Sequence, residues 1–272
     1  MADNDGFQTV SLKKRNKKRQ NKKNLSEEEI ITDKLFNKYN TLIQKSLLFK
    51  NLVPNLDYVK DVRCIRCLAL GSFIEEIQPL YQLSLLIEIV NHLIELNCKD
   101  DDYSLVVSLY DPAFTPKDIS YINNELNNKK GNITWIYEDE KNWENKESDK
   151  NVLYYIPHGD LHLLNYLLPL LKPRFYLGNY IFDHLARVKA DDDMAYLNNM
   201  KLKHSKNIKN SDSDDFEHIK QHKKKQEPIE NIPVEFVDLY FNDIKVYTNF
   251  HESIEQGPWL SSFSSLALHE FI

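Results

Sequence analysis

The chain has 272 residues, enough for one sizeable domain or two small ones, and 42% of them are hydrophobic. The formal net charge is −6, yet residues 1–24 carry eight Lys or Arg against Asp3 and Asp5, a local charge of +6 that leaves −12 for the remainder. This acidic remainder argues against a domain that coats DNA or RNA, because neutralising phosphates requires a basic face.

The N-terminal segment 1–25 contains the run SLKKRNKKRQNKK and is predicted to be a disordered basic tail, since like charges repel and few apolar residues are present to pack. Such an arm could be a nuclear-localisation signal, contact nucleic acid or an anionic membrane surface, or be solvated without a partner. The first residues show no apolar stretch that could serve as a signal peptide, and no run approaches the ~18 apolar residues that a membrane span requires, so neither a signal peptide nor a transmembrane segment is expected. We therefore expect a cytoplasmic protein that could also enter the nucleus.

Hydrophobic periodicity next predicts strands that alternate with helices. The predicted strands cover 63–70, 103–110, 132–137, 152–156 and 174–177. The predicted helices cover 26–47 (with a capping box from Ser26 to Glu29), 76–96, 116–126 (capped by Thr115) and 161–171. Alternation of this kind with almost continuously apolar strands predicts an α/β fold, a three-layer Rossmann-like sandwich with a mainly parallel sheet covered on both faces.

A polar insertion is predicted before the last strands. The composition turns polar after residue 189, and we interpret about 200–230 as a flexible insertion and not a second domain. Two closing strands are predicted over 234–240 and 243–250, joined by a tight turn near Phe241-Asn242. Residues 26–272 then form a single α/β domain.

The three cysteines are Cys64, Cys67 and Cys98, and an odd, low count is typical of a reducing compartment. Cys64 and Cys67 have CxxC spacing but lie in a predicted strand. Zinc sites of this type require a second ligand pair, and redox CxxC motifs open a helix. Buried strand cysteines are therefore the favoured interpretation, and no metal site is assigned.

Polar or glycine-containing motifs follow four of the predicted strands, at the edge where open α/β sheets bind ligands. The candidate pocket residues are Gly71, Ser72, Asp111, His158 and Asn179. Because the carboxyl ends of parallel strands meet at one edge, these residues are expected to line a common ligand-binding pocket.

Each motif also has a purely structural interpretation. Gly71-Ser72 could present free N–H groups to an anion, or form a tight turn with Ser72 near a helix cap; the full GxGxxG pattern is absent, with Ala69 and Ile74 at two of its positions. Asp111 could bind ribose hydroxyls, or accept hydrogen bonds from its own Asp-Pro turn.

Two histidines, His158 and His162, flank Asp160 near the start of a predicted helix, so general-base catalysis or haem or metal ligation is conceivable. Asp183 and His184 follow Asn179 with the same two interpretations. No nucleophile elbow, P-loop, HExxH or kinase signature occurs, so catalytic residues stay unknown and hydrolase or triphosphatase mechanisms lack support.

Five of these segments, in order and spacing, resemble the domain of the sensitivity-to-red-light-reduced family, which is found in plants, fungi and animals. The segments are CLALGSF (67–73), YQLSLL (81–86), YDPAFT (110–115), YYIPH (154–158) and LGN (177–179). The stretches 240–243 and 246–250 are similar to the family's closing segment, and a fungal member is expected.

The resemblance implies a regulatory protein, since relatives are linked to circadian and light signalling in plants, haem-biosynthesis control in animals and microtubule-related processes in yeasts. It supplies no catalytic residue. The favoured hypothesis is therefore a regulatory or interaction protein without turnover that acts through an unknown protein partner. The alternatives are a nucleotide- or S-adenosylmethionine-dependent transferase, and a haem- or metal-binding sensor that uses the strand-end pocket; the cofactor is unknown.

Overall fold

The computed structural model describes residues 33–127, 132–139, 151–189, 193–204, 238–250, 257–259, 261–263 and 265–272. The predicted basic tail, the Ser26 cap and most of the predicted insertion at 200–230 lie outside these ranges.

The described residues form a seven-stranded sheet in the order β3-β2-β1-β4-β5-β7-β6. Its strands are β1 (Cys64–Leu68), β2 (Leu105–Tyr110), β3 (Ile133–Tyr137), β4 (Val152–Ile156), β5 (Phe175–Asn179), β6 (Ile244–Tyr247) and β7 (Leu266–Phe271). All pairings among β1 to β5 are parallel, whereas β7 runs antiparallel to both β5 and β6. The predicted mainly parallel sheet is confirmed, with all five predicted core strands present.

The helices also follow the prediction, with a few differences in extent. They are α1 (Asp33–Lys45), α2 (Leu47–Leu56), α3 (Ile77–Leu96), α4 (Pro116–Tyr121), α6 (Leu161–Leu171), α7 (Ile181–Arg187) and α8 (Ala195–Lys203), with short turns η2 (Asp57–Val59) and η3 (Ile122–Leu126). The helix predicted over 26–47 ends early because Ser46 starts a new one: its Oγ accepts a hydrogen bond from the Phe49 N–H (3.1 Å) and caps α2. Thr115 caps α4 as predicted.

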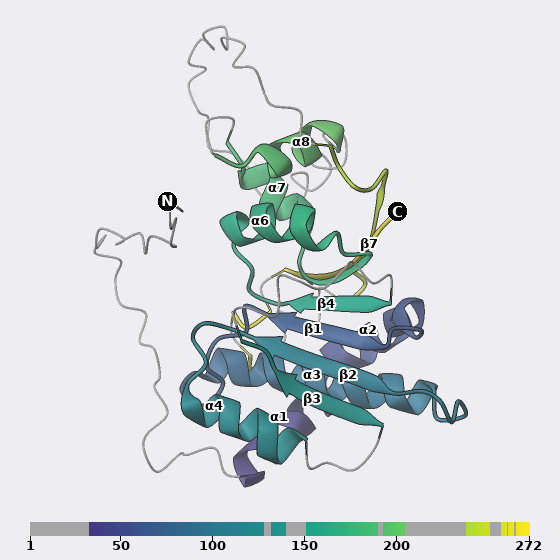
Figure 1. Ribbon diagram of the computed structural model, residues 1–272, viewed down its shortest axis with the longest axis vertical. Coiled ribbons are helices and arrows are strands. Elements are labelled where there is room, and N and C mark those ends of the chain that lie inside the picture. The colour runs from purple at the N-terminus through teal and green to yellow at the C-terminus, as the bar shows by residue number, and fades with distance from the viewer. Residues whose placement is uncertain are drawn as a thin grey trace, which may run out of the picture.

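The sheet separates two hydrophobic cores, because successive side chains of a strand point to opposite faces. On β4, Leu153 and Tyr155 join the core under α1 to α3, while Tyr154 and Ile156 join the core under α6 to α8. Figure 1 shows the corresponding layers, with α1, α3 and α4 beside the β1-β2-β3 half and α6, α7 and α8 stacked together beyond β4. The molecule is therefore an α/β sandwich whose two helical layers are offset along the sheet.

The predicted closing hairpin is confirmed only in part. The strand predicted over 243–250 is present as β6, whereas residues 238–240 of the strand predicted over 234–240 are not in a strand, and 234–237 lie outside the described residues. β6 pairs instead with β7, which was not predicted. Burial explains the outcome: β7 is buried along nearly its whole length and is inserted between β5 and β6, whereas β6 is half exposed, as suits an edge. The segment at Phe241 is instead a loop, tied down by the Asn242 and Asp243 N–H groups, which both donate to the Ile272 carbonyl (2.5 and 3.0 Å).

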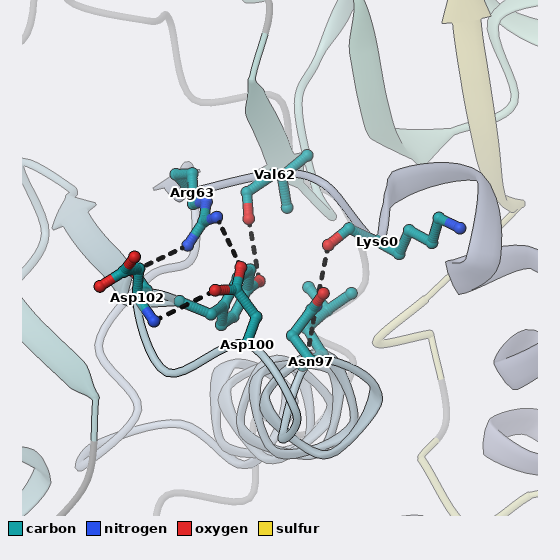
Figure 2. A network of polar contacts seen from close by, with 8 residues as sticks. Lys60, Val62, Arg63, Asn97, Asp100 and Asp102 are labelled. Carbon is teal, nitrogen blue, oxygen red and sulfur yellow. Dashed lines mark hydrogen bonds and ion pairs between the residues drawn. The ribbon is translucent and has the colours of Figure 1, made fainter.

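The amino-terminal edge of the sheet is fixed by a polar network at the α3–β2 turn (Figure 2). The Arg63 guanidinium donates to the Asp100 carboxylate (3.0 Å) and the Asp102 carbonyl (3.1 Å), and Asn97 Nδ2 donates to the Lys60 carbonyl (2.9 Å). These bonds join the start of β1 to the turn before β2. The whole network lies at the end of the sheet opposite the carboxyl ends of the strands.

Candidate functional site

The five predicted pocket residues lie at the carboxyl ends of four strands, as the sequence led us to expect. Gly71 and Ser72 follow β1, Asp111 follows β2, His158 follows β4, and Asn179 is the last residue of β5. The residues fall into two groups, however, with different surroundings. The β1–β2 group forms a closed hydrogen-bond network, and the β4–β5 group lines a cavity.

The β1–β2 group is organised by two buried carboxylates. Asp111, 7% exposed, accepts hydrogen bonds from the Gly71 N–H on Oδ2 (2.8 Å) and from the Ala113 N–H on Oδ1 (2.7 Å). Gly71 has φ +82°, in the left-handed region, and Ala69 two residues earlier has φ +55°. Asp111 thus holds a turn that the backbone of most residues would resist.

The second carboxylate belongs to Asp118 on α4, which sequence reasoning missed. Asp118 is fully buried and accepts from the Ser72 hydroxyl (2.7 Å), the Thr115 hydroxyl (2.7 Å) and the Ile74 N–H (3.0 Å), besides forming a capping box at the start of α4. Ser72 is therefore engaged within the protein. This geometry agrees with the alternative that the Gly71-Ser72 motif is a structural turn.

The raised pKa of a nearby cysteine also argues against a reactive site in the β1–β2 group. Burial raises the pKa of the Cys67 thiol on β1 well above its usual value, and the nearby Asp111 carboxylate raises it further. A thiol with a raised pKa is a poor nucleophile. Cys64 and Cys67 both lie in β1, as predicted. Cys67 is buried, whereas Cys64 is partly exposed.

The β4–β5 group lines a cavity of about 390 Å³. The lining residues come from the β4–α6 loop, the end of β5, α7 and the residue before β7: His158, Gly159, Asp160, Asn179, His184, Arg187 and Ser265. Two of the five predicted pocket residues, His158 and Asn179, therefore share a cavity, together with Asp160 and His184, which the sequence also indicated.

Two of the residues that line this cavity, here called its floor, have side chains that are more than nine-tenths buried. Asn179, 7% exposed, donates from Nδ2 to the Gly159 carbonyl (3.0 Å), which leaves its Oδ1 buried without a hydrogen-bond partner in the described residues. His184, 8% exposed, likewise has a buried Nδ1 with no partner in that part of the chain. Leaving a buried polar atom unsatisfied costs ~1–3 kcal/mol, so each such atom calls for an explanation. Atoms of this kind also occur away from the cavity, for example His92 Nε2 and His204 Nε2, but Asn179 and His184 are the ones that line it.

His184 is neutral at physiological pH. Burial is the main cause that lowers the pKa of His184 to about 4; Arg187 and His158 also lower it, and Asp160 partly opposes them. A neutral imidazole offers one donor and one acceptor. His158, Asp160 and Arg187 are exposed and form the rim.

The position of α7 depends on a buried histidine from β7. The Ile181 N–H donates to His269 Nε2 (3.1 Å), so His269 Nδ1 carries the proton and donates to the Tyr176 carbonyl (3.2 Å). This bridge fixes the start of α7 against β5 and thereby directs His184 to the cavity. Gly178 allows the close packing there, since a Cβ would lie 2.3 Å from the Tyr176 hydroxyl and 2.4 Å from the Ile156 carbonyl.

The described residues contain no group of three or more His, Cys, Asp or Glu side chains arranged to hold a metal ion. His162 is exposed and is not among the residues that line the cavity. In the same parts of the chain, no helix is both long and apolar enough to cross a membrane.

Sequence reasoning missed Arg187 and Ser265 in the cavity. Arg187 could have been found, because it follows His184 by three residues and such pairs share one helix face. Ser265 could not, since the strand that positions it, β7, was not predicted.

These features define an α/β protein with a polar cavity at the carboxyl ends of its central parallel strands. A comparison with protein families identifies the SRR1 domain over residues 17–270, nearly the whole chain. The chain therefore belongs to the SRR1 domain family, which confirms the resemblance to the sensitivity-to-red-light-reduced proteins. Neither the search of curated proteins nor the search of solved structures finds a match.

Proposed function

We propose that this chain is a regulatory protein whose α/β domain binds a small polar ligand in the β4–β5 cavity and passes the bound state to a protein partner. The observation that carries the proposal is the cavity floor, where Asn179 Oδ1 and His184 Nδ1 are buried without hydrogen-bond partners in the described residues. Membership of the SRR1 domain family supports the regulatory part of the proposal.

Two desolvated polar atoms at the floor destabilise the free protein, and a ligand that hydrogen-bonds to both removes that penalty. Ligand binding then stabilises the native state by mass action, about 2.7 kcal/mol at a hundredfold excess over Kd. Because α7 carries both His184 and Arg187, a ligand held at the floor also stabilises this short helix. A partner that contacts α7 would therefore bind the liganded and the free protein with different affinities.

The test is a thermal-shift screen of the full chain against nucleosides, S-adenosylmethionine, nicotinamide cofactors, haem, divalent metals and polar metabolites. The variant Asn179→Leu removes the floor acceptor, and Asp111→Ala is its control in the other group. We expect a ligand whose stabilisation is lost in Asn179→Leu and kept in Asp111→Ala. A ligand with the opposite pattern, or no ligand at all, would contradict the proposal.

A second candidate function is a nucleotide- or S-adenosylmethionine-dependent transferase, and the observation that favours it is the strand order. The order β3-β2-β1-β4-β5 is that of the Rossmann-like dinucleotide-binding sheets, and a reversed strand inserted next to β5 is typical of S-adenosylmethionine-dependent methyltransferases. This support is by fold analogy. Against it, each Asp111 carboxylate oxygen already accepts a hydrogen bond from a backbone N–H. Radiolabelled S-adenosylmethionine binding that is abolished in Asp111→Ala would favour the transferase.

Three further predictions concern the location of the protein, its basic tail and the process that it regulates. Cytoplasmic or nuclear location, contact of the basic tail with nucleic acid, and a role in one of the processes of the relatives stay predictions. The tail prediction can be checked by comparing the location of the full chain with that of a variant whose 1–25 Lys and Arg residues are replaced by Gln.

A further inference from the structure

We propose that the ligand of the β4–β5 cavity is a small zwitterion, a molecule of the α-amino acid class with both an ammonium and a carboxylate group. This inference rests on the proposed function, since it names the ligand of the same cavity. It follows from the charges at the rim, the hydrogen-bonding groups at the floor and the size of the cavity.

The rim carries two opposite charges. Arg187 and Asp160 both line the cavity, and in the described parts of the chain neither forms an ion pair with the other or with a further residue. Asp160 Oδ1 accepts the capping hydrogen bond from the Leu163 N–H (2.8 Å), which leaves Oδ2 for a ligand. An anion alone would meet the Asp160 carboxylate, and a cation alone would meet the Arg187 guanidinium. A zwitterion satisfies both charges.

The floor selects for a donor on the ligand. Asn179 Nδ2 is held by the Gly159 carbonyl, so the amide orientation is fixed and Oδ1 is an acceptor. An ammonium group has three donors and can bond to Asn179 Oδ1 and to Asp160 together. The carboxylate of the same ligand then accepts from the planar Arg187 guanidinium, which binds carboxylates in a two-bond geometry.

The cavity size agrees with this class. A volume of about 390 Å³ is near the lower end of the roughly 300–1,000 Å³ typical of small-molecule sites. It suits a ligand of amino-acid dimensions better than a dinucleotide. His184, neutral and buried beside Arg187, keeps the floor free of net charge.

The experiment uses the full chain and matched probes. Each of the twenty standard α-amino acids is tested at millimolar concentration by thermal shift, and any that raises the melting temperature is followed by isothermal titration. The binding amino acid is then compared with its carboxamide, which lacks the carboxylate, and its N-acetyl form, which lacks the ammonium. We expect each of these two changes to weaken binding at least about tenfold, as loss of one charge-assisted hydrogen bond does.

Two charge-removing variants assign the groups. Arg187→Gln is expected to weaken the amino acid but not its carboxamide, and Asp160→Asn, which keeps a residue able to cap α6, is expected to weaken the amino acid but not its N-acetyl form. Lys117→Gln, which removes an exposed charge from α4 in the other half, is the control and should change neither.

The outcomes separate this inference from the proposed function. If a ligand of another class binds and depends on Asn179, the proposed function stands and the zwitterion assignment is wrong. If an amino acid binds equally to the wild type and both variants, the assignment is wrong as well. If none of the twenty amino acids shifts the melting temperature, the assignment is overturned, while the wider ligand screen still decides the proposed function.

Discussion

The two halves of the carboxyl edge differ in how their polar groups are used. At the ends of β1 and β2, Asp111 and Asp118 each accept several hydrogen bonds from neighbouring loops. At the ends of β4 and β5, Asn179 and His184 are equally buried but have atoms with no partner in the described residues. The polar groups of the first half are satisfied within the protein, and the second half is where we propose that a ligand binds.

Position at the end of a strand is therefore not enough to identify a ligand site. Both halves lie where α/β sheets bind ligands. What separates them is whether the polar groups are satisfied by the protein itself, because a satisfied carboxylate has already gained most of the energy that a ligand could offer. The predictions below test this difference by removing one polar group at a time from each half.

The largest effect is expected for Asp118→Ala in the closed half. The substitution leaves the Ile74 and Thr115 N–H groups without their buried acceptor (3.0 and 2.8 Å in the wild type), and the expected loss is about 3–5 kcal/mol of unfolding free energy. Guanidinium unfolding followed by tryptophan fluorescence measures it. Asp118→Asn keeps one carbonyl acceptor and should lose roughly half as much.

The control for Asp118 lies in the other half. Asp160→Ala removes an exposed cap from α6 and is expected to cost only about 1 kcal/mol. Equal losses for Asp118→Ala and Asp160→Ala would show that the closed network is not a special source of stability.

The second effect is the pH dependence contributed by His184. Its pKa is lowered to about 4 in the folded protein, whereas an unfolded histidine titrates near 6.5, so the unfolded state binds the extra proton between these values. Stability is therefore complete above pH 6.5 and falls as the pH drops towards 4, by up to about 3 kcal/mol. His184→Gln should flatten this part of the profile.

The measurement is urea unfolding of the wild type and His184→Gln at a series of pH values, because the difference between them removes the titration of other groups. Replacing the exposed His162 by Gln is the matched control and should leave the slope unchanged. A slope that persists in His184→Gln would mean that another group causes it.

The strands and helices differ in how well the sequence predicts them. The five parallel strands were predictable because each is a short apolar run with turn residues at its end, and Thr115 and Pro116 marked the start of α4. β7 was missed because LALHEF contains His269 and Glu270, which interrupt its apolar run, and the burial of His269 depends on its contact with Tyr176 of β5, which the sequence does not show.

The site was predictable only in part for a similar reason. The strand-end rule placed His158 and Asn179 correctly at the carboxyl edge, but the same rule grouped them with Asp111. Only the structure shows that Asp111 is engaged with Gly71 and Ala113, since hydrogen-bond satisfaction depends on loop conformation and not on residue type. Arg187 was accessible through its helical spacing from His184, as noted above.

A smaller effect is expected from paired glycine substitutions. Gly71→Ala places a Cβ on a residue with φ +82° and 3.0 Å from Pro79 Cγ, so a loss of about 1–2 kcal/mol is expected. Gly159→Ala also meets a side-chain atom at 3.0 Å, Ile156 Cγ2, but Gly159 has no positive φ, so the variant should cost less. Chemical unfolding measures the loss of unfolding free energy in both variants. A larger loss for Gly159→Ala would mean that the stronger backbone constraint lies in the β4–β5 half, which contradicts the prediction.

The smallest effect is expected for Asn179→Leu, and it tests the comparison most directly. The substitution removes the donor to the Gly159 carbonyl but also removes the unpartnered Oδ1, so the two consequences oppose each other and unfolding free energy should change by less than about 1 kcal/mol. Asn179→Asp is different, because a buried carboxylate cannot donate to the Gly159 carbonyl and is expected to cost about 2 kcal/mol or more at neutral pH. Denaturant unfolding of both variants at pH 7 measures these changes. If Asn179→Leu were as damaging as Asp118→Ala, Asn179 would be a structural group like the closed network, and the cavity would lose the feature that marks it as a ligand site.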